Sequence, residues 1–218
     1  SETAFININE SPIPIRWFTP TLEVDLCGHA TMASAKILFE HFPDIAGSEI
    51  SFSSKSGILK VSKNAENICL NFPVDDPEPQ KMDAFFAEAL GESPIEILRG
   101  TDDFLAVFET EQQIQTMNPD FTKLAKINSR GVVISAPGND VDFVSRCFFP
   151  QTGVDEDPVT GSAHTMLIPY WAKQLDKIEF KAHQLSARGG ALDCKLINNR
   201  VLISGKSVIY FEGMISII

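Results

Sequence analysis

The sequence is short of basic charge. Its 218 residues include 18 Lys and Arg against 29 Asp and Glu, a formal net charge of −11 at pH 7. Nucleic-acid binding needs a basic surface that displaces counterions, so this balance argues against a nucleic-acid partner. No apolar run approaches the roughly 18 to 20 residues that cross a bilayer, and no basic-then-apolar signal segment opens the chain. We therefore expect a cytoplasmic protein that binds neither nucleic acid nor membrane.

Cysteine is sparse as well. The four thiols, at Cys27, Cys69, Cys147 and Cys194, form no Cys-x-x-Cys pair, and no histidine cluster completes a zinc-ligand spacing. A chain of this length does not need disulfides for stability, so the pattern is typical of reduced thiols. The sequence also has no phosphate-binding loop, dinucleotide fingerprint or nucleophile elbow. We predict neither a metal site nor a cofactor.

Strand-like segments dominate the chain, with β-branched and aromatic residues between Gly, Pro, Asn and Asp turns. Four helices are predicted among them, over residues 29–42, 81–90, 119–126 and 162–173. Pro169 lies inside the last one, where it predicts a kink or local break. Residues 72–79 hold three prolines and are the best candidate for a linker. They predict an N-terminal domain at residues 1–75 and a C-terminal domain at residues 76–206.

Glycine and other small residues precede two of the apolar helices. Gly28-His29-Ala30-Thr31 and Gly161-Ser162-Ala163 each lie where backbone N–H groups are free and the helix dipole favours an anion. Simple helix initiation is the favoured explanation of one such turn alone. Two matched turns make simple helix initiation a weaker explanation. They also suggest that the chain has two halves, each a strand-rich layer with one buried helix.

Several side chains could carry chemistry, and each has a plainer interpretation. His29, at a helix start that disfavours imidazolium, is a candidate acid or base, or a core histidine satisfied by a carbonyl. Asp157 lies in an acidic turn, where a solvated helix cap is the alternative. Cys27 is a candidate nucleophile or base, or simply a small buried apolar residue. Arg188 and Gly189 offer a fork for a carboxylate, or form a surface turn.

The chain resembles the phenazine-biosynthesis isomerase (PhzF-like) family in three ordered motifs: Ser1-Glu2-Thr3-Ala4-Phe5, Asp25-Leu26-Cys27-Gly28-His29-Ala30-Thr31 and Asp157-Pro158-Val159-Thr160-Gly161-Ser162-Ala163-His164. The resemblance covers essentially the whole chain. It implies an α+β, diaminopimelate epimerase-like fold of two pseudo-symmetric domains, each a mixed β-barrel-like sheet around a central helix. A strand over residues 207–218 would complete the first domain. Family members carry a further region before the glutamate motif, which this sequence is expected to lack.

The resemblance also implies a reaction. Family members move a proton between carbons of a small carboxylate without a cofactor. By resemblance, Glu2 is the base and proton shuttle, and His29 and Asp157 serve to return the proton. On sequence physics alone, Glu2 would be a frayed terminal charge. The implied substrate-binding residues are Gly28, Ala30, Thr31, Gly161, Ser162, Ala163, Arg188 and Gly189. A homodimer is the family expectation.

Two alternatives stay open. One is a catalytically silent member of the same fold that binds a small molecule or acts as a scaffold. The other is an epimerase that depends on Cys27. Diaminopimelate epimerases use a cysteine in each domain, whereas the second-domain motif here has Asp157 and no cysteine. This difference argues against two-thiol epimerisation.

Overall fold

The computed structural model describes residues 2–19 and 22–214. They divide into two compact units, which we call the N-terminal unit (residues 2–70 with the segment from residue 204) and the central unit (residues 71–203). The division falls within strands β6 (Asn67–Pro73) and β15 (Arg200–Gly205), a little before the boundaries expected from the sequence. The chain therefore leaves the N-terminal unit through one strand and returns through another.

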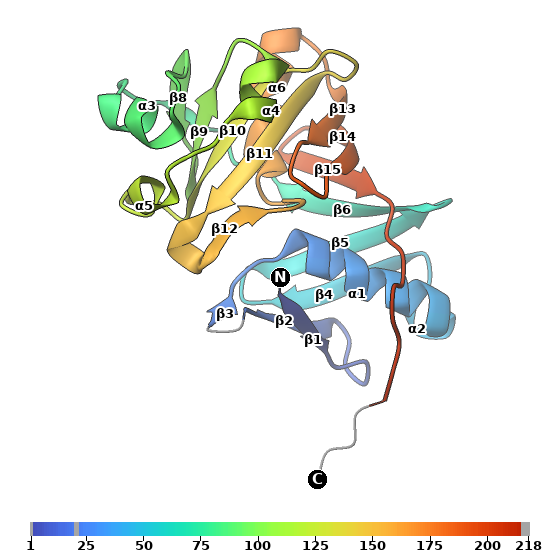
Figure 1. Ribbon diagram of the computed structural model, residues 1–218. Coiled ribbons are helices and arrows are strands. Elements are labelled where there is room, and N and C mark those ends of the chain that lie inside the picture. The colour runs from blue at the N-terminus through green and yellow to red at the C-terminus, as the bar shows by residue number, and fades with distance from the viewer. Residues whose placement is uncertain (1, 20–21, 215–218) are drawn as a thin grey trace. The chain divides into compact units, whose positions relative to one another are not determined.

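The N-terminal unit is a mixed sheet packed with one long helix, α1 (Gly28–His41), which is followed by the short α2 (Pro43–Ala46). Its strands are β1 (Thr3–Ile6), β2 (Ile13–Phe18), β3 (Glu23–Val24), β4 (Glu49–Ser54) and β5 (Gly57–Asn64). The sheet order is β1-β2-β4-β5, with β2 and β4 parallel and β3 added to β2. Alternate residues of β2, among them Ile15 and Trp17, are buried together with Ala35 and Leu38 of α1. Figure 1 shows α1 in blue beside these strands.

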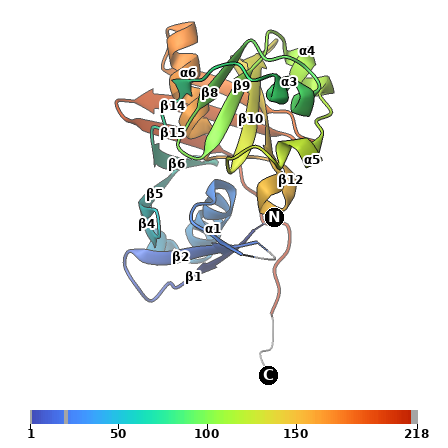
Figure 2. The ribbon, with the colours of Figure 1, turned by 90° about the vertical axis from the view of Figure 1, so that its left-hand side faces the viewer.

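The central unit is a larger mixed sheet with the order β14-β13-β11-β10-β9-β8-β7, and β12 pairs with β11. Its strands are β7 (Glu78–Pro79), β8 (Glu96–Arg99), β9 (Asp103–Val107), β10 (Gly131–Pro137), β11 (Phe143–Phe149), β12 (Val154–Asp157), β13 (Glu179–Gln184) and β14 (Gly190–Ile197). Strands β9 and β10 are parallel, as are β11 and β13, and the other described pairs of this unit are antiparallel. Figure 2 shows β8, β9 and β10 side by side.

Helices cover both faces of this sheet. The short helices α3 (Ala84–Leu90), α4 (Glu111–Thr116) and α5 (Phe121–Leu124) form one core with β8 to β11, around Phe108 and Phe148. The long helix α6 (His164–Leu175) packs on the opposite face, where Trp171 stacks on Phe143 with ring centroids 5.6 Å apart. Because both faces are buried, β10 and β11 are almost continuously apolar. Pro150–Thr152 forms a single 3-10 turn.

Helix α6 runs through Pro169 without a break, so the local break predicted there does not occur. Proline has no N–H for the carbonyl of Thr165, one turn earlier. The backbone N–H of Asp75 donates to that carbonyl instead, at 3.0 Å. The missing intrahelical hydrogen bond is thus replaced from outside the helix.

The strand predicted over residues 207–218 is wrong for the part that the structure describes. Residues 207–214 form no helix or strand, and residues 215–218 lie outside the described residues. The side chains of Val208, Tyr210, Phe211 and Met214 are exposed. Alternating apolar residues favour a strand only where a neighbouring strand supplies N–H and C=O partners.

Among the described helices, none is long and apolar enough to cross a membrane.

Candidate active site

Glu2 and His29 form a hydrogen-bonded pair in the N-terminal unit. Glu2 precedes β1 and His29 is the second residue of α1, and the Nε2 atom of His29 lies 3.0 Å from Oε2 of Glu2. The side chain of Glu2 is 18% exposed and that of His29 is 23% exposed, so both are accessible to a ligand. The hydrogen bond from His29 lowers the pKa of Glu2, and partial burial opposes this shift. Glu2 is therefore a carboxylate at neutral pH, able to accept a proton.

Cys27 lies against the same pair. Its Sγ atom is 3.6 Å from Nε2 and 3.8 Å from Nδ1 of His29, and the thiol is buried. One ligand atom from each of Glu2, Cys27 and His29 lies within 4.8 Å of the others. The folded chain thus brings together a carboxylate, an imidazole and a thiol. Cys27 and His29 are neighbours in the sequence, whereas Glu2 joins them only because β1 contacts α1.

The start of α1 is open to an acceptor from outside the helix. Cys27 is its N-cap, with extended backbone and no side-chain cap. Thr31 closes the first turn, donating from its N–H and its hydroxyl to the carbonyl of Cys27, at 3.1 and 2.7 Å. The N–H groups of Gly28 and Ala30 precede the first intrahelical donor. The Thr31 side chain is fully buried, and both of its donors are directed at the Cys27 carbonyl, so Thr31 holds the turn in place.

Asp157, in the central unit, is held by a buried glutamine. Thr160 donates its hydroxyl to Oδ2 of Asp157 at 2.5 Å. Gln184, only 1% exposed, donates to the Asp157 carbonyl at 2.6 Å and to the Thr160 hydroxyl at 3.2 Å. Its side-chain oxygen accepts from the N–H of Thr160 at 2.7 Å. Sequence patterns do not reveal Gln184, because a polar residue at the end of an alternating strand has no local signature of burial.

The turn Gly161-Ser162-Ala163 follows directly and leads into α6. Arg130 donates to the hydroxyl of Ser162 at 3.2 Å. The same guanidinium makes a two-pronged ion pair with the buried Asp103, with 3.0 Å between Nε and Oδ1. Sequence reasoning missed this pair, which depends on the register of two parallel strands that places Asp103 beside Gly131.

Arg188 and Gly189 belong to a loop tied to the Asp157 turn. Ser186 donates its hydroxyl to the carbonyl of Pro158 at 2.8 Å and accepts from the N–H of Gly189 at 3.0 Å. Gly189 has a φ of +71°, which favours glycine. The Arg188 side chain is exposed. In the central unit, the predicted residues therefore gather around one loop cluster.

Two other ionisable side chains near this cluster, His164 and Cys147, are fully buried in the core of the central unit. His164 is fully buried and contacts the carbonyl of Thr160 through Nδ1 at 2.8 Å. Burial lowers the pKa of His164 to about 4, so the ring is neutral at pH 7. Cys147 pairs with Asp157 in the β11–β12 register, and burial raises the pKa of its thiol well above the usual value. Cys147 is therefore a buried thiol and a poor source of thiolate.

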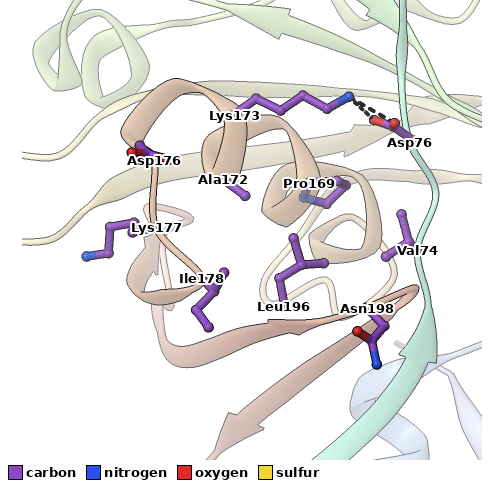
Figure 3. A pocket seen from close by; sticks show the side chains of 10 residues that line it. All are labelled: Val74, Asp76, Pro169, Ala172, Lys173, Asp176, Lys177, Ile178, Leu196 and Asn198. Carbon is purple, nitrogen blue, oxygen red and sulfur yellow. Dashed lines mark hydrogen bonds and ion pairs between the residues drawn. The ribbon is translucent and has the colours of Figure 1, made fainter.

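A cavity of about 360 Å³ lies elsewhere in the central unit, between α6, β14 and the proline-rich segment (Figure 3). Its wall includes Val74, Pro169 and Leu196. An ion pair between Lys173 and Asp76, at 2.6 Å, lies at its side. None of the predicted site residues lines this cavity. Its wall also includes Asp176 and Lys177, so apolar and charged side chains line it together.

Comparison with known proteins decides the family. The model of the phenazine biosynthesis-like protein family (PhzC-PhzF) matches residues 1–213. The chain belongs to this family. It is 47% identical over 215 residues to a Pseudomonas aeruginosa protein that is named as an uncharacterized isomerase, and the match covers 99% of this chain and 82% of that protein. The crystal structure of a PhzF family protein from Enterococcus faecalis is 42% identical, with a TM-score of 0.91, and the match covers 97% of this chain and 81% of that one.

The comparisons also bear on fold and enzyme class. A hydroxyproline epimerase from Agrobacterium vitis, with trans-4-hydroxy-L-proline bound, has a TM-score of 0.62 over 96% of this chain and 72% of its own. At 11% identity it shows the fold alone. The α+β, epimerase-like fold predicted from the sequence is confirmed. Bacterial relatives at 46–47% identity are named isomerases, and this PhzF-like chain is an enzyme of that class.

Proposed function

We propose that the chain is a cofactor-independent isomerase that moves a proton between two carbons of a small cyclic or unsaturated carboxylate. The observation that carries this proposal is the 3.0 Å hydrogen bond between Glu2 and His29. It holds the carboxylate ionised and orients it, while both side chains stay partly exposed. An ionised carboxylate next to an imidazole is the pair that general acid–base catalysis at carbon requires.

The proton balance is simple. Glu2 removes a proton from a substrate C–H bond, and the electron pair of that bond delocalises into the adjoining unsaturated system. The proton then returns to a different carbon, either directly from Glu2 or after passing from Glu2 to His29 across their hydrogen bond, so that both groups regain their starting protonation and no atom is gained or lost. Backbone N–H groups at the start of α1, those of Gly28 and Ala30, suit the substrate carboxylate by charge and direction.

Asp157 is proposed as the further acid–base residue, and its hydrogen bond from Thr160 fixes its carboxylate. The proposal also assigns substrate binding to the central unit's loop cluster, through Gly161, Ser162, Ala163, Arg188 and Gly189. The Ser162 hydroxyl accepts from Arg130, so its own hydrogen and the backbone N–H are the donors proposed for the substrate. A homodimer is part of the proposal and is tested by sedimentation.

A second function is favoured by one observation, the 3.6 Å distance between Cys27 and His29. It is the geometry of a thiol with a base, and an epimerase would use Cys27 in this way. Against this stands the central unit, where the thiol closest to Asp157 in the sheet register is the buried Cys147. A two-thiol reaction lacks its second thiolate there.

The test is deuterium incorporation in heavy water, with a panel of small unsaturated and amino carboxylates that includes a dihydro-hydroxyanthranilate. We expect carbon-bound deuterium with the wild type and a loss of roughly 10²- to 10⁴-fold in Glu2→Gln. The matched control Glu66→Gln removes an exposed carboxylate from the same unit and should keep full exchange. Exchange retained in Glu2→Gln would refute the assigned base.

Other outcomes separate the alternatives. Ligand-induced thermal stabilisation without exchange of any compound would identify a silent binding protein. If alkylation abolishes exchange in the wild type while Cys27→Ser still exchanges deuterium after the same treatment, Cys27 lies near the site without a chemical role. Exchange abolished in Cys27→Ser as completely as in Glu2→Gln would favour the thiol-dependent epimerase.

A further inference from the structure

We infer that Glu2, Cys27 and His29 form a binding site for a zinc-like divalent cation, and that the metal inhibits the enzyme by occupying its base. The metal site itself stands on geometry alone. The inhibition rests on the proposed function of Glu2. Spacing in the sequence does not reveal this site, because Glu2 comes from a distant segment and Cys27 and His29 are only two of the ligands.

The donor atoms lie close enough together to reach a tetrahedral zinc centre after small side-chain rotations. Zinc bonds of about 2.3 Å to sulfur and about 2.0 to 2.1 Å to nitrogen or oxygen separate a sulfur and a nitrogen ligand by about 3.6 Å, and a nitrogen and an oxygen ligand by about 3.3 Å. In the structure, Sγ of Cys27 lies 3.6 Å from Nε2 of His29. The same Nε2 lies 3.0 Å from Oε2 of Glu2. Because Sγ also lies 3.8 Å from Nδ1, the imidazole ring has to turn so that the lone pair of Nε2 points between Cys27 and Glu2.

The chemistry of the three ligands selects the metal. A thiolate and a carboxylate together balance the charge of a divalent cation, and the imidazole adds a neutral nitrogen. Thiolate and imidazole favour zinc over magnesium and calcium, which prefer oxygen ligands. Three protein ligands leave the fourth position of a tetrahedron open, as in catalytic rather than structural zinc sites. Water or a substrate carboxylate would fill that position.

Two of the ligands are held in place before any metal arrives. Cys27 and His29 flank Gly28 at the beginning of α1, and Thr31 fixes the carbonyl of Cys27 with two hydrogen bonds. Such preorganisation reduces the ordering that binding requires. The remaining adjustment is a rotation of the His29 ring and a movement of the Glu2 side chain, which lies before β1.

Metal binding has a defined proton balance and a defined effect. The cation displaces the proton of the Cys27 thiol, which passes to solvent. The proton that Nε2 of His29 shares with Glu2 moves to Nδ1 of the same ring through solvent, so that Nε2 and Oε2 each offer a lone pair to the metal. With Oε2 bound to the metal, Glu2 no longer accepts a proton from carbon. Zinc should therefore stop the isomerisation, and a chelator should restore it.

The metal site is tested by spectroscopy on the whole chain, independently of turnover. Protein dialysed against a chelator is titrated with cobalt(II), which reports tetrahedral thiolate coordination through a near-ultraviolet charge-transfer band and intense visible bands. We expect both in the wild type with one metal per chain. We expect Cys27→Ser to lose the charge-transfer band, and both Cys27→Ser and His29→Gln to bind zinc at least about tenfold more weakly by calorimetry.

The matched control is Cys69→Ser, which removes a half-buried thiol from strand β6 and should leave the cobalt spectrum unchanged. Circular dichroism confirms that each variant is folded. Zinc affinity equal in the wild type, Cys27→Ser and His29→Gln would overturn the site. Tight zinc binding without inhibition of deuterium exchange would overturn the inhibitory role. If the wild type exchanges no compound, the proposed function fails, and the cobalt spectrum still decides the metal site.

Discussion

The side-chain amide of Gln184 donates to the main-chain carbonyl of Asp157 over 2.6 Å, and its oxygen accepts from the N–H of Thr160 at 2.7 Å. A fully buried side chain at the end of β13 thus fixes the backbone on both sides of the turn that carries Asp157. The position of the Asp157 carboxylate therefore depends on a residue from another strand.

Gln184→Met should destabilise the protein by roughly 2 to 4 kcal/mol, because it leaves the Thr160 N–H and the Asp157 carbonyl without their partner in a buried place. The melting temperature measures this loss. Gln80→Met is the control, since Gln80 is exposed and its contact with Glu78 is long, at 3.4 Å. Equal melting temperatures for both variants would contradict the role of Gln184.

His164 should make stability depend on pH below neutrality. Burial lowers its pKa from 6.5 to about 4, so between these values the unfolded chain binds a proton that the folded chain does not. The free energy of unfolding is therefore full above pH 6.5 and falls by about 3 kcal/mol as the pH decreases to about 4. His164→Asn keeps a donor for the Thr160 carbonyl and should remove this part of the pH dependence. Urea unfolding at several pH values measures the free energy of unfolding. If this free energy depends on pH in the variant as strongly as in the wild type, the prediction is contradicted.

Glu2 should also make stability fall in acid, in a lower pH range and because its charged form, not its neutral form, is favoured in the folded protein. Its pKa in the folded protein is lowered from 4.5 by the hydrogen bond from His29. The stability that the pair contributes is therefore present above pH 4.5 and is lost as the pH falls through the lower, folded pKa. Glu2→Gln lacks this contribution, so the difference in unfolding free energy between wild type and variant should shrink in acid. A difference that stays constant with pH would show that the Glu2–His29 bond does not form in solution.

Asp103→Asn should weaken the anchor of the Ser162 turn. The substitution leaves the Arg130 guanidinium without its anionic partner. Breaking a fully buried ion pair in this way lowers the free energy of unfolding by about 3 to 5 kcal/mol. We expect a smaller loss here, roughly 1 to 3 kcal/mol, because the Arg130 side chain is 31% exposed. Chemical denaturation measures the change. Asp140→Asn, on an exposed turn, is the control and should lie within about 0.5 kcal/mol of the wild type.

Local patterns predicted the long helices well. The sequence places the first helix at residues 29–42 and the structure at Gly28–His41, because Pro43 cannot continue it. Helix α4 was missed, although its capping box between Thr110 and Gln113 is a local signal that could have been found. The break expected at Pro169 failed because a distant N–H replaces the lost hydrogen bond.

The candidate site was only partly accessible from the sequence. The closeness of Cys27 and His29 follows from their spacing at a helix start. Glu2 entered through family resemblance, since nothing local distinguishes it from a terminal charge. Arg130 and Asp103 meet through the parallel pairing of β9 and β10, and strand pairing over such a separation has no local signature.

The two passages of the chain through β6 and β15 have a consequence for its synthesis. The central unit is one continuous segment, residues 71–203, inserted into an N-terminal unit made of two segments. The segment from residue 204 is therefore made after every residue of the central unit. The N-terminal unit begins first and is completed last, because residues 2–70 lack their final segment until the central unit has been synthesised.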